Sequence, residues 1–137
     1  MFGSKRGGAK PPSRIDSLIG AGTKIEGNIV FGGGLRVDGE VRGNIDALED
    51  QPSTLVISEN ARIEGVIKVA HVVINGTVIG PVNASETLEL QPNARVTGDV
   101  EYESLEMQQG AVVQGRLIHQ GTASGKAIEL KLASSNS

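Results

Sequence analysis

The chain has 137 residues, contains no cysteine, and has a formal net charge of −3. A chain of this length suits one domain with short tails, and the lack of cysteine excludes disulfides and thiolate metal sites. Only two Phe and one Tyr are present, which indicates a core built from aliphatic rather than aromatic side chains.

Residues 1–14 are predicted to form a disordered basic tail, because Gly and Pro dominate and no periodicity is visible. The tail carries four cations and no acid, so the remaining residues have a net charge of −7. Phe2 lies near Lys5, Arg6 and Lys10, and an apolar side chain among cations favours binding to an anionic membrane. A flexible spacer explains the same composition, and the two readings stay open.

A five-residue unit recurs six times between residue 25 and residue 117: an aliphatic residue, any residue, Gly, any residue and a second aliphatic residue. Successive copies start 16, 22, 15, 18 and 17 residues apart. The six copies are Ile25 to Ile29, Val41 to Ile45, Ile63 to Ile67, Val78 to Val82, Val96 to Val100 and Val113 to Leu117. A recurrence at this period is typical of a solenoid.

A second unit, two aliphatic residues at spacing two, precedes each of the last five copies, and spacing two is the period of a β-strand. These pairs are Leu35/Val37, Leu55/Ile57, Val72/Ile74, Leu88/Leu90 and Leu105/Met107. The sequence therefore predicts an all-β protein, with a single parallel β-helix of about six short turns over residues 15–118. The aliphatic residues of both units are predicted to point inwards.

Sharp corners are predicted to join the short strands. Asp38-Gly39 and Asn75-Gly76 occupy the two shortest corners, where such dipeptides favour positive φ angles. The glycine of each five-residue unit marks a further bend that other residues tolerate poorly. Residues 46–54 lengthen one turn, and we expect them to form a surface loop.

Outward positions are predicted from the same alternation. Glu26, Arg42 and Glu64 share one outer position on successive turns, where alternating charges attract weakly or simply form a solvated face. Val66 and Ile79 are also expected to face outwards.

Residues 119–137 are predicted to form a C-terminal tail, because the repeat fails after Leu117. Ile128, Leu130 and Leu132 alternate and form a candidate end strand that would cover one end.

The two ends of the predicted β-helix are the candidate functional site. A β-helix exposes unpaired strand edges at both ends unless a helix or loop caps them. The end turns are apolar, and stacking of one molecule on the next would bury them and propagate into a filament. The predicted contact residues are Leu18, Ile19, Ile25 and Ile29 in the first turn and Val113, Leu117 and Ile118 in the last.

The sequence carries no motif of catalysis, of a metal site or of cofactor binding, so we predict a protein that is not an enzyme. His71 and His119 have no carboxylate or serine at a motif spacing, and we expect both on the surface or at corners. Gly32-Gly33-Gly34 lacks the Lys and Ser/Thr of a phosphate-binding loop. The acidic, aromatic-poor body argues against nucleic-acid binding.

The segments Ile-Gly-Ala-Gly-Thr-Lys-Ile-Glu-Gly-Asn-Ile (19–29) and Leu-Arg-Val-Asp-Gly-Glu-Val-Arg-Gly-Asn-Ile (35–45) resemble the bactofilin family. Val-Ile-Asn-Gly-Thr-Val-Ile-Gly-Pro-Val (73–82) is similar in kind. The resemblance implies a right-handed β-helix of triangular cross-section with disordered tails, in a bacterial cytoskeletal protein that polymerises end to end without nucleotide.

The same resemblance implies partners and a location. It implies a cytoplasmic protein, peripheral on the inner face of the cytoplasmic membrane, that scaffolds cell-wall enzymes or polar proteins and affects cell shape. Phe2, Lys5 and Arg6 match the membrane-targeting tail of some members. Many members carry an aromatic residue at the polymer contact near the C-terminal end of the core, where this chain has Leu117 and Ile118 instead.

Two other functions are open at this point. A β-helix that does not polymerise would present a flat face to a protein partner. A β-helix acyltransferase would use a histidine, but those sequences repeat an aliphatic residue every six positions, which this chain does not do.

Overall fold

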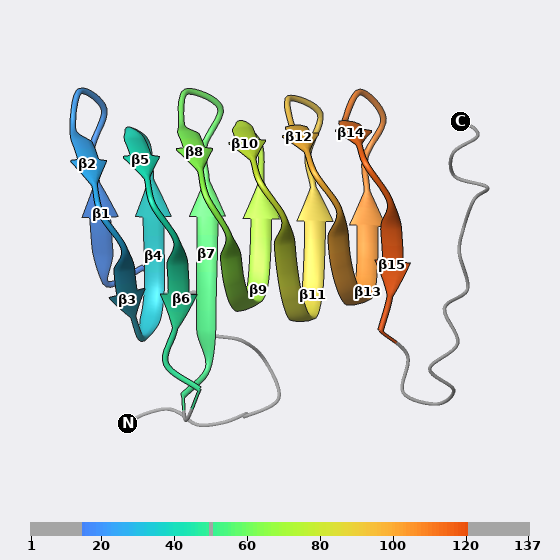
Figure 1. The fold of residues 1–137 in the computed structure, drawn as a ribbon, viewed down its shortest axis with the longest axis horizontal. Helices are drawn as coiled ribbons and strands as arrows, with labels where there is room; N and C mark the ends of the chain where they lie inside the picture. The colour runs from blue at the N-terminus through green and yellow to red at the C-terminus, as the bar shows by residue number, and fades with distance from the viewer. Residues whose placement is uncertain (1–14, 50, 121–137) are drawn as a thin grey trace.

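The computed structural model describes residues 15–49 and 51–120, and this part of the chain folds into fifteen β-strands with no helix. Figure 1 shows the strands stacked along one axis, from β1 at one end to β15 at the other. All pairings between strands are parallel, as expected for a chain that winds in one direction. The predicted all-β solenoid is confirmed.

Each turn contributes one strand segment to each of three stacks, which we call faces I, II and III. Face I holds β1 (Ser17–Ile19), β4 (Gly33–Val37), β7 (Ser53–Ile57) and the second halves of β9 (Ile67–Ile74), β11 (Val82–Leu90) and β13 (Val100–Met107). Face II holds β2 (Lys24–Glu26), β5 (Glu40–Arg42), β8 (Arg62–Glu64), β10 (Thr77–Ile79), β12 (Arg95–Thr97) and β14 (Val112–Gln114). Face III holds β3 (Ile29–Phe31), β6 (Ile45–Ala47), the first halves of β9, β11 and β13, and β15 (Leu117–His119). Six turns and three faces therefore give a three-sided solenoid.

The predicted aliphatic pairs align in register from turn to turn. Leu55 lies beside Val72, which lies beside Leu88 and then Leu105, so one column runs through four turns of face I. Because side chains alternate along a strand, every second residue points into the solenoid. The spacing-two pattern in the sequence thus identified the inner positions correctly.

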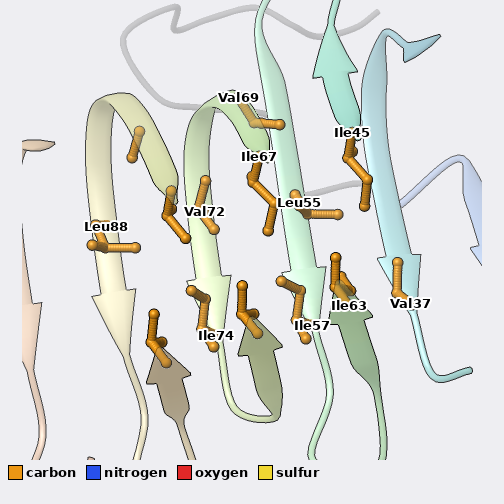
Figure 2. Close-up of a cluster of buried hydrophobic side chains, with 14 of the residues drawn as sticks. Val37, Ile45, Leu55, Ile57, Ile63, Ile67, Val69, Val72, Ile74 and Leu88 are labelled. Carbon is orange, nitrogen blue, oxygen red and sulfur yellow. The ribbon is translucent and has the colours of Figure 1, made fainter. Parts of the chain in front are cut away.

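The core is a narrow aliphatic stack enclosed by the three faces. Figure 2 shows side chains from different faces converging on it, among them Val37, Ile45 and Ile63. Most of these side chains have no exposed surface at all. Phe31 and Tyr102 also belong to this core, so the Phe and the Tyr in the described part of the chain are both buried, although the sequence pattern did not assign them there.

The predicted positive φ angles at the two short corners are wrong, since neither Gly39 nor Gly76 has one. Glycine is required there because of close backbone contact with the turn before. A Cβ on Gly76 would lie 2.2 Å from the carbonyl oxygen of Ser58, and one on Gly39 would lie 2.4 Å from that of Thr23. Lack of space, rather than backbone conformation, excludes side chains at these corners.

The glycines of the five-residue units stack into one column at the corner between faces II and III. Five of the six have positive φ, as predicted: Gly27, Gly43, Gly65, Gly80 and Gly98. Gly80 combines a φ of +139° with a position where a Cβ would lie 2.2 Å from the carbonyl oxygen of Gly65. Both conformation and packing therefore exclude other residues here.

Side-chain oxygens next to this column link successive turns. The backbone N–H of Asn44 donates to Asn28 Oδ1 at 2.9 Å, and the N–H of Val66 donates to Asn44 Oδ1 at 3.0 Å. The next residue along the column is Pro81, which has no backbone N–H to donate. Val66 has no side-chain oxygen, but at this position no N–H needs an acceptor.

The predicted loop at residues 46–54 is shorter than expected. Asp46 and Ala47 belong to β6, and Ser53 and Thr54 belong to β7, where both are buried. Leu48 follows β6 and still donates its N–H to the Phe31 carbonyl at 2.9 Å, so the described part of the insertion outside the strands is short. Pro and acidic residues in the sequence correctly indicated an insertion, but they did not show that it begins after Ala47 and ends before Ser53.

The outer position shared by Glu26, Arg42 and Glu64 is confirmed by the register of face II. Arg42 Nε lies 3.7 Å from Glu64 Oε1 and 3.8 Å from Glu40 Oε2. These groups are solvated, so each pair contributes at most about 1 kcal/mol. Ile79 is exposed and Val66 is half-buried, so Ile79 follows the prediction more closely.

Candidate functional site

The first turn presents three strands that have a partner on one side only. Within the described residues, β1 pairs with β4, β2 with β5 and β3 with β6, and nothing pairs with their other edges. An unpaired edge offers backbone N–H and C=O groups to another strand. We call this surface the N-terminal tip.

The last turn presents a second surface of the same kind, which we call the C-terminal tip. In the part of the chain that the structure describes, the second half of β13, together with β14 and β15, has no strand beyond it. Figure 1 shows the two tips at opposite ends of the solenoid. The predicted end strand around Ile128, Leu130 and Leu132 lies outside the described residues.

Apolar side chains that are fully enclosed in the middle turns are partly open at the tips. Ile25 and Ile29 at the N-terminal tip are half-buried, as are Val113 and Leu117 at the C-terminal tip. Their counterparts one turn inwards, such as Val41 and Val96, are 0–1% exposed. A second molecule stacked on either tip would bury this surface, which is the usual driving force for association.

Two of the predicted contact residues lie on the outside of the solenoid. Leu18 aligns with Arg36 and is 61% exposed, and Ile118 aligns with Glu101 in an outer row. Ile19 points inwards beside Val37 and is buried. The structure therefore brings Ile19, Ile25 and Ile29 together at one tip and Val113 and Leu117 at the other, and a role for any of them in a contact stays a prediction.

Three inner positions of the C-terminal tip were missing from the predicted contact set. Leu105 and Met107 lie in the last described segment of face I, and Met107 is 43% exposed because no described strand covers it. His119 takes the inner position two residues after Leu117. The spacing-two rule that identified the other inner residues also points to all three of these.

The membrane-binding residues predicted in the tail, Phe2, Lys5, Arg6 and Lys10, lie outside the described residues. The described residues contain no helix with the length and apolar character needed to cross a bilayer.

Neither histidine joins a catalytic or metal-binding group with other residues of the described part of the chain. His71 lies at a corner, as predicted, with Nδ1 2.8 Å from Thr87 Oγ1 and Nε2 3.5 Å from Glu86 Oε1. This carboxylate comes from the next turn, which is why no motif spacing in the sequence revealed it. His119, in contrast, is an inner residue that faces Tyr102 rather than a surface residue. Among the described residues, no group of three or more His, Asp or Glu side chains is placed to hold a metal ion.

Two ionisable side chains have pKa values displaced by their surroundings. A hydrogen bond from Ser58 and the nearby Arg36 guanidinium lower the pKa of Asp38, although partial burial works against them. Burial raises the pKa of Tyr102, so this phenol stays neutral at physiological pH. Both displacements arise from the packing of neighbouring turns.

The fold and its tips define a class: a parallel β-helix whose described end turns leave strand edges and apolar side chains open. This geometry is suited to contact with other β-strands.

Comparison with known proteins identifies the family. The sequence model of the bactofilin family, described as polymer-forming cytoskeletal, matches residues 17–118. Bactofilin BacP of Myxococcus xanthus (strain DK1622) is 26% identical over 106 residues, which cover 77% of this chain and 42% of BacP. Bactofilin BacO of the same organism is 29% identical over 102 residues, which cover 74% of this chain and 78% of BacO. No solved structure gives a significant match.

The chain therefore belongs to the bactofilin family, a family of polymer-forming cytoskeletal proteins. The matched segment spans less than half the length of BacP, so BacP contains a long part with no counterpart in this match.

Proposed function

We propose that this protein polymerises end to end through its two tips into filaments that need no nucleotide. The observation that carries the proposal is the pair of tips, where strand edges without a described partner surround partly open aliphatic residues. Stacking would continue the backbone hydrogen bonds and the apolar core from one molecule into the next. The new hydrogen bonds and the burial of apolar surface would both favour the polymer. The family description supports self-association, and the absence of a phosphate-binding motif supports assembly without nucleotide.

Neighbouring residues with opposite orientations allow a sharp test at each tip. Leu117→Arg places a cation in the inner column of the C-terminal tip, whereas Ile118→Arg places it one residue away on the outside. Ile19→Arg and Leu18→Arg form the matching pair at the N-terminal tip. The chemical change is the same within each pair, so only its position relative to the tip differs.

Negative-stain electron microscopy of the purified protein in nucleotide-free buffer should show filaments for the wild type and for both outer variants. The inner variants should lose filaments while keeping the circular dichroism of a β-protein. A wild type that sediments as a fixed small species at high concentration would instead favour the binding-module function. Filaments unchanged in both inner variants would place the contacts away from the tips.

We further propose that the filaments lie on the inner face of the cytoplasmic membrane and organise cell-wall enzymes or polar proteins. The support is the basic N-terminal tail with Phe2, repeated along a filament. One such anchor binds weakly, but many tails in one polymer bind together with much higher avidity. Liposome pelleting of the full chain and of Lys5→Glu/Arg6→Glu would test this, because charge reversal should abolish pelleting with anionic vesicles. Equal pelleting of both proteins contradicts the membrane role.

A further inference from the structure

The last strand of the solenoid places a histidine where earlier turns have apolar residues. His119 aligns with Tyr102, which aligns with Ala84 and then with Val69, so the four side chains form one inner column of face III. Val69, Ala84 and Tyr102 are buried, while His119 is half-buried. His119 is thus the last described residue of this column and is ionisable, whereas the three residues before it are buried from water.

Among the described strands, only β13 lies beside His119, because no described strand pairs with the other edge of β15. The ring centroid of His119 lies 6.0 Å from that of Tyr102, with 54° between the ring planes. The backbone N–H of Gln120 donates to the Tyr102 carbonyl at 2.7 Å, which continues the parallel register to the end of the strand. No hydrogen bond or ion pair within the described residues involves the His119 side chain.

The charged groups of the neighbouring elements do not face the imidazole. On β13, Glu101 lies in an outer row and Glu103 and Glu106 are exposed. Arg116 is exposed and pairs with a carboxylate of the preceding turn, and β14 has no ionisable side chain. Among the described residues, the only titratable neighbour inside the column is Tyr102, whose phenol is neutral. A proton on the His119 ring would therefore meet no counter-charge from the described core.

We propose that His119 makes assembly through the C-terminal tip sensitive to pH, with its neutral form compatible with the contact and its charged form opposed to it. The proposal rests on the end-to-end assembly proposed above. A second copy of this chain on the tip would enclose His119 as fully as β15 encloses Tyr102, which is 3% exposed. Enclosing an unpaired cation is strongly unfavourable, whereas enclosing a neutral ring is not.

The direction of the effect follows from proton linkage. The free tip binds a proton that the contact excludes, so association is strongest at high pH and weakens as pH falls. Histidine is the side chain that changes charge between about pH 5 and pH 8. Each excluded proton weakens a contact by up to about tenfold for every pH unit below the onset of protonation. Carboxylates stay ionised above about pH 5.5, which separates their effect from that of histidine.

The chain contains two histidines, so one supplies the matched control for the other. Full-length wild type, His119→Leu, His119→Gln and His71→Gln are compared by sedimentation at pH 7.5 and pH 5.5, and the concentration of unassembled protein is measured. We expect this concentration to rise about tenfold at pH 5.5 for the wild type and for His71→Gln. It should change less than twofold for His119→Leu and His119→Gln, which carry no ionisable group at this position.

The outcomes distinguish this proposal from the proposed function. Polymers that form equally at both pH values overturn the pH switch and leave end-to-end assembly standing. A pH response that persists in both His119 variants, or that disappears in His71→Gln alone, also overturns it. A wild type that forms no polymer at either pH contradicts the proposed function and the pH switch together. Circular dichroism of each variant at both pH values checks that the fold is retained, and His119→Gln serves if His119→Leu does not fold.

Discussion

Replacement of Gly80 by alanine tests whether close contact between turns stabilises this solenoid. Gly80 has a φ of +139°, and a Cβ there would lie 2.2 Å from the carbonyl oxygen of Gly65. An ordinary contact between these atoms needs about 1 Å more. The oxygen belongs to the backbone of the preceding turn, so relief requires two stacked turns to separate.

The magnitude follows from two contributions. An alanine held in this backbone region is strained by about 1–3 kcal/mol, and the overpacking adds about 1–3 kcal/mol. We expect Gly80→Ala to lower the free energy of unfolding by about 2–5 kcal/mol, a large part of the 5–15 kcal/mol typical of a folded domain. Gly20→Ala is the matched control, because a Cβ there meets no atom within 4 Å and Gly20 has no positive φ. Its effect should stay within about 0.5 kcal/mol.

Urea unfolding followed by circular dichroism measures both variants, with all proteins at one concentration because the proposed assembly would also stabilise the folded state. A Gly80→Ala protein within about 0.5 kcal/mol of the wild type would refute the reasoning. Equal losses in both glycine variants would also refute it, since a general glycine effect rather than contact between turns would then be responsible.

Three further predictions concern single interactions. Asn44→Ala removes the oxygen that accepts a hydrogen bond from the N–H of Val66 at 3.0 Å, and it should lower the free energy of unfolding by about 1–3 kcal/mol. Asn44→Asp keeps the acceptor, so it should lower the free energy of unfolding much less. Ile63→Ala should cost about 2–5 kcal/mol because Ile63 is 0% exposed, whereas Ile79→Ala on the adjacent strand should cost much less because Ile79 is 36% exposed. Asp38 has a lowered pKa in the folded state, so its contribution to stability is present above the unfolded pKa and is lost as pH falls through that value and below it. Asp38→Asn should therefore flatten the acid side of the stability curve, as measured by thermal unfolding between pH 6 and pH 2.5.

Each of these predictions has a contrary result. Equal destabilisation by Asn44→Ala and Asn44→Asp would show that the side-chain oxygen does not support the turn. Equal effects of Ile63→Ala and Ile79→Ala would contradict the assignment of inner and outer positions. An acid limb that is the same for wild type and Asp38→Asn would show that other carboxylates govern acid unfolding.

Much of the architecture was predictable because it follows from local patterns that repeat. Spacing two along the chain defines which side of a strand faces inwards, so Leu55, Val72 and Leu88 were assigned to the core before their alignment was known. The number of repeats predicted the number of turns, because each repeat of a solenoid forms one turn that contacts only its neighbours. The bactofilin resemblance of residues 19–45 agrees with the family match over residues 17–118.

The orientation of side chains at the tips was predicted less well than that of the core, because it depends on register. A shift of one residue turns a side chain from the inside of a strand to the outside. Leu18 and Ile118 were selected for being apolar, yet alignment with Arg36 and Glu101 places them outside. His119 was overlooked for being polar, although the alternation from Leu117 assigns it inwards.

The sequence by itself determined the class of fold, the number of turns and most of the inner residues. Each repeat in the sequence forms one turn of the solenoid, so equivalent residues of successive repeats stack on one another. Only the tertiary structure decided which atoms of successive turns touch: that Gly76 lies against Ser58, that Glu86 reaches His71 and that Tyr102 lies beneath His119. These contacts join residues 15 to 18 positions apart, and their geometry depends on how each corner directs the next strand. Local propensity specifies the strands, whereas the stacking of whole turns specifies the contacts between them.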